Sequence, residues 1–443
     1  MASFLLATMP SGVALGEENP KVDLAQKPVE QLSFHQALER ALLKSPDYDT
    51  LMRTSHNSHL LSKNAWATIF PEIDLQAYHQ YADQGGSLPP TAVIYPHAPW
   101  SNFAGVTVNE NLYDNGESYR QVEISNLSAS IADLAANRGR QALLLKVAKA
   151  YYDFSSAMGS IVLQRQEIET LRQQFRTIEG RYRQGMSSNR DFLRIKVQLQ
   201  RAEISLQTQE ISIEESGTAL RLAIGESRDV GFVPLSEDAN SLDGMRFPDV
   251  MPEETFDYRI ARMQDEVSDL KFGSAVRADL PRLTLKGSYS YDVPEYLGPR
   301  VPGQDDPYWN FTGLIVLDYT LFDWGIRHHN IEIADNQKQI EMDVQKTIRL
   351  SAAQALNRLK KQVQLYLNSY RESRSILKNE EEAYESLNRG YREGKVTYLD
   401  LITALDDLYS SRTQNIGLQY ALLKARADVA FYQGNLDEVL QNQ

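Results

Sequence analysis

Residues 181–193 read RYRQGMSSNRDFL, and residues 390–402 repeat the pattern as GYREGKVTYLDLI. Each stretch holds a tyrosine, a glycine three positions later and an aspartate six positions after the glycine. A glycine permits the left-handed backbone that ends one helix, and an aspartate in the first turn of the next helix interacts favourably with its dipole. Both stretches therefore predict a tight turn between two helices.

The repetition extends far beyond these turns. An offset of 209 positions relates the two turns, and it also relates LYDNG at 112–116 to LFDWG at 321–325. A constant offset held over such a distance indicates a duplicated architecture. The chain is therefore predicted to hold two copies of one unit, residues 32–225 and residues 253–434.

Each copy is predicted to run helix, strand, strand and helical hairpin. Alternation of apolar and polar residues is typical of a strand, whereas apolar spacings of three and four are typical of a coiled-coil helix. The strands are predicted at residues 73–81, 102–113, 282–293 and 309–321, and the hairpins at residues 118–224 and 326–433. The fold class that follows is mainly α with β, with two internal repeats.

The remaining segments lie between or outside the two copies. Residues 1–31 are predicted to be a leader outside the fold, because Phe4 to Leu15 resemble the apolar part of a secretory signal that lacks its basic start. A disordered leader is the alternative. Residues 226–252 lack periodicity and are predicted to link the copies, and residues 435–443 form a C-terminal tail.

Composition excludes several classes of protein. The net charge of -13 argues against a nucleic-acid partner, because phosphate binding relies on clustered Lys and Arg. The absence of cysteine excludes thiol nucleophiles, disulfides and cysteine-ligated zinc. No internal run of about 20 apolar residues exists, so a membrane crossing would have to use strands.

No reactive constellation emerges from the sequence. His56 and His59 lie one helical turn apart without an evident third ligand, and His328 and His329 are adjacent, so that their side chains diverge on a helix. Phosphate-binding glycine loops, nucleophile elbows and zinc-peptidase motifs are missing. We therefore expect no catalytic residue, no metal and no cofactor.

The helices are unusually long. A helix of about 66 residues extends roughly 100 Å, and two shorter helices stacked end to end would match it, as the wall of a uniform tube requires. Four amphipathic strands of this length suit a tilted bilayer crossing. Unpaired strand edges are costly in lipid and four strands cannot close on themselves, so several chains would share one sheet: two chains give eight strands, three give twelve and a passage. Half-buried strands of a soluble sandwich are the alternative.

Over residues 32–434 the chain resembles the TolC-like outer-membrane efflux protein family, through the duplicated element order, the two strand-to-helix turns and the two hairpin ends. The resemblance implies a trimeric α/β barrel in the outer membrane of a Gram-negative cell. Each chain would give four transmembrane β-strands and long antiparallel coiled-coil hairpins to a tunnel of twelve helices across the periplasm. The segment 226–252 would belong to an equatorial collar.

The resemblance also implies a function without catalysis. The homotrimer would be the exit duct of a tripartite efflux pump or a type I secretion system. It would sit in outer-membrane lipid and would work with a periplasmic adaptor (membrane fusion) protein and an inner-membrane transporter of the RND, ABC or MFS type. A non-transporting coiled-coil scaffold is the alternative from another class.

By resemblance, the hairpin ends close the periplasmic mouth of the pore. The gate residues carried over are Tyr182, Arg190, Asp191, Tyr391, Asp400 and Thr403. Tyr391 would hydrogen-bond Asp191, and a ring of three Asp400 side chains would favour cations. The alternative, from the residues alone, is that each aspartate is only a residue in the first turn of its helix.

The chain departs from the protein after which the family is named at two gate positions. Val396 stands where that protein has a latch arginine, and Thr403 stands where it has a second pore-facing aspartate. Arg190 is a candidate replacement cation. The turns themselves would receive the adaptor, and they comprise Gly185, Met186, Ser187, Ser188, Gly394, Lys395, Val396 and Thr397.

Overall fold

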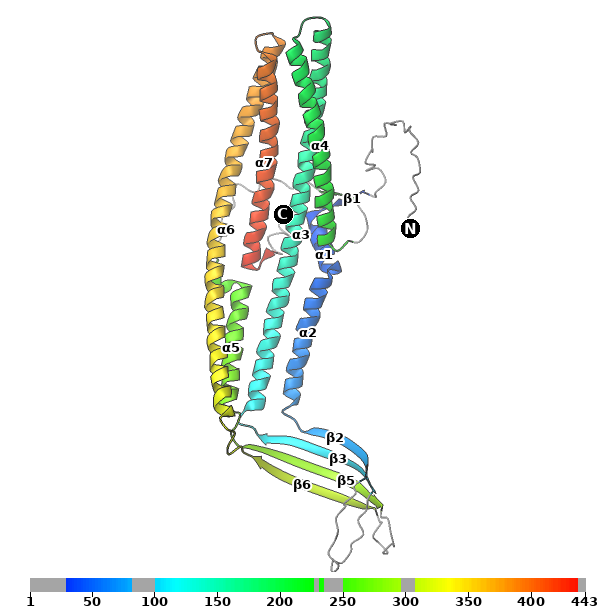
Figure 1. Cartoon of the computed structure of the whole chain (residues 1–443), viewed down its shortest axis with the longest axis vertical. Helices are drawn as coiled ribbons and strands as arrows, with labels where there is room; N and C mark the ends of the chain where they lie inside the picture. Colours follow the sequence, from blue (N-terminus) through cyan, green and yellow to red (C-terminus); the bar gives the residue numbers. More distant parts are fainter. Residues whose placement is uncertain (1–28, 82–99, 227–230, 235–249, 296–306, 437–443) are drawn as a thin grey trace, which may run out of the picture.

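The computed structural model describes residues 29–81, 100–226, 231–234, 250–295 and 307–436. The molecule is elongated, with helices along its long axis and a curved sheet at one end (Figure 1). The first half contains β1 (Val29–Leu32), α1 (Phe34–Lys44), α2 (Pro46–Ala67), β2 (Glu72–Tyr81), β3 (Trp100–Tyr113), α3 (Glu117–Arg183), α4 (Asn189–Ala223) and β4 (Gly231–Pro234). The second half contains η2 (Pro252–Glu254), α5 (Phe256–Arg277), β5 (Arg282–Glu295), β6 (Tyr308–Asp318), α6 (Ile326–Arg392) and α7 (Tyr398–Gln433).

The two halves follow the same template, as the repeat predicts. Helices α3 and α6 both contain 67 residues. α2 and α4 lie one after the other along α3, while α5 and α7 lie in the same way along α6 (Figure 1). The prediction that two shorter helices together match one long helix is confirmed. We refer to α3 with α4 as hairpin 1 and to α6 with α7 as hairpin 2.

Both long helices start at a turn built from the same chemistry. Asp114 accepts hydrogen bonds from the backbone N–H groups of Gly116 at 3.1 Å and Ser118 at 2.7 Å. Asp323 repeats this arrangement with the N–H groups of Gly325 at 3.0 Å and Arg327 at 2.6 Å. These carboxylates satisfy N–H groups that have no partner within the helix. The LYDNG and LFDWG motifs are therefore equivalent in structure.

The sheet is antiparallel and has the strand order β2-β3-β5-β6. Its register aligns Leu75, Val106, Tyr289 and Phe311 across all four strands. The next row, on the opposite face, contains Gln76, Gly105, Ser290 and Asn310. Leu75 is 81% exposed and Phe311 is 77% exposed. The sheet thus has an apolar face that nothing in the described part of the chain covers.

The last predicted strand ends earlier than expected. Residues 309–321 were expected to be extended, but β6 ends at Asp318. Asp318 is paired with Arg282, the first residue of β5, so the chain beyond it has no neighbouring strand to pair with. Tyr319 and Leu321 are exposed. The alternation of apolar residues therefore continues past the hydrogen-bonded ladder.

The predicted boundary of the leader is wrong at residues 29–31. β1 pairs in parallel with β4, and Leu32 is fully buried. The Tyr151 hydroxyl on α3 donates to the Leu32 carbonyl at 3.1 Å. A parallel pair of four-residue strands, separated by about 200 positions, leaves no local periodicity to detect. Residues 4–15, which resemble a signal, lie outside the described residues.

The C-terminal tail also begins inside the fold. Leu436 is fully buried, and its backbone N–H donates to Gln141 Oε1 on α3 at 3.2 Å. Leu436 belongs to the larger of the two clusters of buried apolar residues. In this cluster Phe34, Tyr151 and Tyr152 pack against one another. This equatorial core ties the start of the chain, the middle of α3 and the end of α7 into one body.

Candidate functional site

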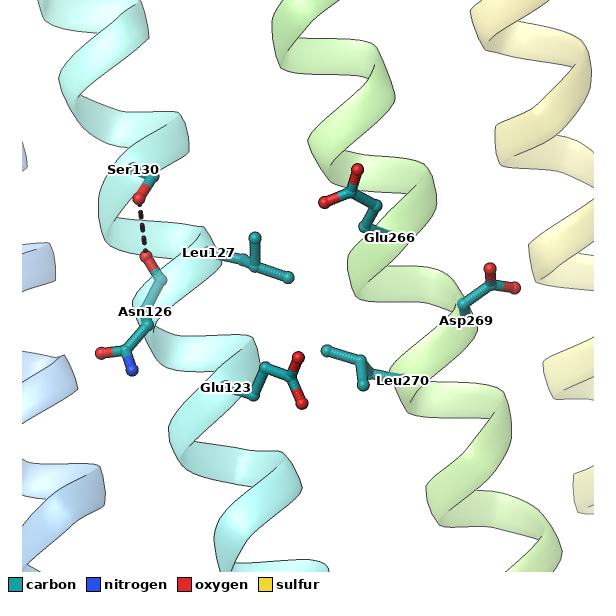
Figure 2. Close-up of a pocket in the computed structure, with 7 residues that line it drawn as sticks. All are labelled: Glu123, Asn126, Leu127, Ser130, Glu266, Asp269 and Leu270. Atoms are coloured by element: carbon teal, nitrogen blue, oxygen red, sulfur yellow. Dashed lines mark hydrogen bonds between the residues drawn. The ribbon is translucent and has the colours of Figure 1, made fainter.

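One cavity lies between α3 and α5, near the sheet. It has a volume of about 390 Å³, and Figure 2 shows Glu123 and Leu127 directed toward α5 and Glu266 and Leu270 directed toward α3. Glu266 is paired with Arg262 at 3.3 Å. Among the described residues, no group of three or more His, Cys, Asp or Glu could hold a metal ion.

The turns of the two hairpins have the same geometry. Gly185 has a φ of 72° and Gly394 a φ of 76°, which is the left-handed region that glycine tolerates. The N–H of the next residue reaches back into the helix in both, from Met186 to the Arg181 carbonyl and from Lys395 to the Gly390 carbonyl. The glycines predicted from the repeat thus end both long helices.

Asp191 and Asp400 belong to the caps of the helices that follow. The backbone N–H of Asp191 donates to Ser188 Oγ at 3.1 Å, and that hydroxyl donates to the Asp191 carboxylate at 2.7 Å. Thr397 and Asp400 make the same pair of bonds at 3.3 and 2.6 Å. These bonds are those of a helix-start residue. They occupy part of each carboxylate, although Asp400 remains exposed.

The two equivalent tyrosines make different contacts. Tyr182 stacks on Phe192 of its own hairpin, with ring centroids 4.9 Å apart. Tyr391 instead reaches the other hairpin, where its hydroxyl accepts a hydrogen bond from Arg181 Nη1 at 3.2 Å and its ring lies 5.4 Å from the guanidinium carbon. Tyr391 therefore joins the two hairpins, and Tyr182 does not.

The expected bond between Tyr391 and Asp191 is absent from the hydrogen bonds of the described hairpin ends. The Asp191 carboxylate is held by Ser188, and Arg181 supplies the donor to the Tyr391 hydroxyl. The gate residues implied by the family resemblance do not include Arg181. This arginine has no counterpart in the second copy, because Gly390 occupies the equivalent position. Arg181 thus does at this junction what the resemblance implies for Asp191.

The other expected gate and turn residues are mostly exposed. Arg190 and Thr403 face solvent, and the Thr403 hydroxyl donates to the Leu399 carbonyl at 3.0 Å. Met186 is 67% exposed. Val396 is half-buried, and a Cβ on Gly390 would lie 2.6 Å from its side chain. The valine therefore packs in the space that this glycine leaves.

A groove of about 280 Å³ separates the hairpins behind the turns. Tyr398 lies in its floor, is 6% exposed and donates from its hydroxyl to Gln174 Oε1 at 3.4 Å. Burial raises the pKa of Tyr398, and it also raises the pKa of Tyr384 on the groove wall. The sequence interpretation missed Tyr398. Its signal is a departure from the repeat, because Asn189 stands at the equivalent position.

None of the helices in the described part of the chain contains a segment that is apolar enough to cross a lipid bilayer. The arrangement so far is a wall of long helices with a two-faced sheet at one end and two capped turns at the other (Figure 1). Its polar side chains bond neighbouring helices to one another and cap the first turns of helices. This geometry is that of a structural wall and offers no evident catalytic arrangement among the described residues.

Solved structures share this fold. A membrane protein from Pseudomonas aeruginosa matches with a TM-score of 0.76 and 18% identity over 91% of this chain and 93% of that one. The outer membrane protein VceC from Vibrio cholerae matches with a TM-score of 0.73 and 17% identity over 90% and 96%. The open state of the MtrE outer membrane channel from Neisseria gonorrhoeae matches with a TM-score of 0.71 and 18% identity over 91% and 89%.

Sequence comparison gives the family. No curated protein sequence matches the chain. The model of the outer membrane efflux protein family matches residues 63–226 and 255–435, which cover most of both copies of the repeat and most of the chain. The predicted resemblance is thereby confirmed. The chain belongs to the outer membrane efflux protein family.

Proposed function

We propose that three copies of this chain form an exit duct that crosses the periplasm and the outer membrane of a Gram-negative cell. The family and the fold are those of outer-membrane efflux channels. The duct would receive its cargo from a periplasmic adaptor and an inner-membrane transporter of the RND, ABC or MFS type. It would serve an efflux pump or a type I secretion system and conduct passively.

The observation that carries this proposal is the incomplete sheet. β2 and β6 are its edges, and within the described chain each is paired on one side only. The exposed apolar face, which includes Leu75 and Phe311, suits contact with lipid. Open edges are costly in a bilayer, so sister chains must supply the missing neighbours. Twelve strands from three copies give a closed sheet with room for a passage.

The flanks of the helical wall support the same assembly. Figure 1 places α6 at one flank and α2 and α4 at the other. On α6, Ile326, Ile333 and Ile340 are at least half exposed and recur every seven residues. On α4, Val197, Ile204 and Ile211 are exposed at the same spacing. A seven-residue apolar repeat is typical of the seam of a coiled coil, and no described residue of the same chain covers either seam.

The hairpin ends would meet the adaptor. Their two turns, 185–188 and 394–397, lie at the end remote from the sheet (Figure 1) and are exposed except at the half-buried Ser187 and Val396. Tyr391 and Arg181 tie the two hairpins of one chain together just behind these turns. The gate role of Asp400 belongs to this proposal as well, since three exposed carboxylates around a narrow mouth would favour cations.

Single-channel recording in planar bilayers tests the proposal. The purified protein should give discrete, cation-selective currents, and Asp400→Asn should lower the selectivity for cations. Asp343→Asn on the shaft of α6 is the matched control and should leave selectivity unchanged. A protein that gives no currents and is extracted from cells without detergent would instead be the coiled-coil scaffold, which has no need of an exposed apolar sheet face.

A further inference from the structure

A polar cluster interrupts the apolar seam between hairpin 1 and α7. The seam is formed by buried side chains such as Ile168, Ile195 and Leu405, which are at most 3% exposed. Glu167 of α3 is half-buried beside this seam, and Asp406 of α7 follows the buried Leu405 at the exposed edge of the seam. A carboxyl group that is partly removed from water costs folding free energy unless it is neutralised or hydrogen-bonded.

Amide side chains hold both carboxyl groups in place. Gln164 Nε2 donates to Glu167 at 2.8 Å, and Gln198 Nε2 on α4 donates to Asp406 at 2.7 Å. Gln164 Oε1 accepts from Ser205 Oγ at 3.1 Å and from Gln209 Nε2 at 3.0 Å. Gln164 thus joins α3 to α4, and the bond between Gln198 and Asp406 joins α4 to α7.

One acceptor oxygen of this cluster has no hydrogen-bond donor, and a cavity lies beside the cluster. Gln198 Oε1 is buried and has no hydrogen-bond partner among the described residues. The amide nitrogen of the same side chain already points to Asp406, so only a donor can satisfy the remaining oxygen. A cavity of about 250 Å³, lined by both carboxyl groups and by Gln198, opens beside it. A protonated carboxyl group is a donor that the cluster itself can supply.

Burial favours the protonated state of both carboxyl groups. Burial and the nearby Asp406 raise the pKa of Glu167. Burial, and to a smaller extent Asp407, raise the pKa of Asp406, against lowering contributions from Gln198, Arg194 and Arg201. The charged groups that act on Asp406 are Arg194 and Arg201 of α4 and Asp407 of α7, and Asp406 in turn acts on Glu167 of α3. The two arginines lower the pKa of Asp406, but that pKa still lies above its ordinary value.

We propose that Glu167 and Asp406 form a proton-operated clamp, which holds hairpin 1 against α7 while the pair retains a proton and releases it when both carboxyl groups are ionised. The clamp regulates the mouth of the duct, so this part of the inference rests on the proposed function. Parting the helices hydrates both acids and returns their pKa values toward ordinary carboxyl values. The packed arrangement is therefore favoured at low pH and weakened as the pH rises through the raised pKa values.

Spin labels at equivalent positions of the two hairpins test the clamp. The chain lacks cysteine, so Gln184→Cys and Glu393→Cys provide two unique labelling sites at exposed hairpin ends. Labelled chain is diluted into unlabelled chain, and the label separation is measured by pulsed electron paramagnetic resonance from about pH 4 to about pH 7. The separation should shift to longer values as the pH rises, with about a tenfold change in the packed-to-parted ratio for each unit of pKa difference.

Two isosteric variants and one control decide the outcome. Glu167→Gln and Asp406→Asn each remove one acid, so both should keep the short separation at every pH. Glu169→Gln makes the same change on the exposed face of α3 and should respond to pH like the original chain. A pH response that persists in both Glu167→Gln and Asp406→Asn would overturn the clamp, as would its absence from the unsubstituted protein. The distances do not depend on conduction, so a missing current would overturn the duct and leave the clamp standing.

Discussion

Hairpin 1 and hairpin 2 have the same backbone and different surroundings. Both long helices contain 67 residues, both turns hold a left-handed glycine, and both return helices start with a hydroxyl and aspartate cap. Yet the first third of α7 is buried, with Tyr398, Leu401, Ile402 and Leu405 at most 6% exposed. In the equivalent part of α4, residues 189–200, Ile195 is the one buried residue. Duplication fixed the geometry, and the contacts between the copies then diverged.

The charges at the two ends differ as well. Residues 176–201 of hairpin 1 carry a basic excess, from Arg176, Arg181, Arg183, Arg190, Arg194, Lys196 and Arg201 against Glu179 and Asp191. The equivalent residues 385–410 of hairpin 2 carry an acidic excess, from Glu385, Glu393, Asp400, Asp406 and Asp407 against Arg389, Arg392 and Lys395. Opposite charge on neighbouring hairpins favours their association at low salt. The ends of the two copies are therefore complementary in charge.

The largest effect should come from the position where burial differs most. Leu405 is 1% exposed in the seam, whereas Lys196 at the equivalent position of α4 is exposed. Leu405→Ala should cost about 2–5 kcal/mol, because it leaves a cavity. Lys196→Ala should change stability by less than about 0.5 kcal/mol. Chemical denaturation followed by circular dichroism measures both, and equal losses would show that the two hairpins are packed alike.

An intermediate effect should separate the two equivalent tyrosines. Tyr391→Ala removes both the hydrogen bond and the cation–π contact with Arg181, which together are worth roughly 1–2 kcal/mol of inter-hairpin association. Tyr182→Ala removes stacking on Phe192 within one hairpin only. Hydrogen exchange should therefore increase at the ends of both hairpins in Tyr391→Ala and at hairpin 1 alone in Tyr182→Ala. The same pattern of hydrogen exchange in both variants would show that the two tyrosines have the same role.

A smaller effect is expected where the two copies are alike, at the strand-to-helix turns. Burial alone would raise the pKa of Asp114, but hydrogen bonds from Ser118, Gly116 and Glu117 outweigh it and lower that pKa. The backbone N–H of Arg327 lowers the pKa of Asp323. A lowered pKa contributes stability above the unfolded pKa, and this contribution is lost as the pH falls through the folded pKa. Acid should therefore loosen both turns.

Substitution of these two aspartates tests their equivalence. Asp114→Ala should cost about 1 kcal/mol, as is typical for a lost helix cap, and Asp323→Ala should act in the same direction. Each variant should lose less stability than the original chain when the pH is lowered from about 6 to about 3, because one acid-sensitive group is gone. Thermal melting at the two pH values measures this. A variant that keeps the full acid sensitivity would show that its turn is held by other groups.

Much of the fold was predictable because the repeat supplies the same information twice. Strand alternation, the glycine turns and the offset of 209 positions located all four strands of the sheet and both hairpins. The β1–β4 pair was not predictable, because parallel pairing at long separation depends on the finished core around Leu32 and Tyr151. The end of β6 was missed since it depends on where its partner β5 starts.

The hairpin ends were predictable in their backbone and less so in their contacts. Gly185, Gly394 and the capping aspartates follow from local sequence rules. The partner of Tyr391 does not, because it lies on the other hairpin, where Arg181 replaces the glycine of the second copy. Glu167 and Asp406 come from different helices and only the folded chain brings them together. Contacts between the copies therefore need the structure.

The mass of the purified protein in mild detergent tests the central claim most directly. Native mass spectrometry should give three times the chain mass of 50.3 kDa, because open sheet edges and unpartnered seven-residue seams on opposite flanks must be filled by sister chains. A stable monomer of 50.3 kDa, with β2 and β6 left unpaired, would contradict it.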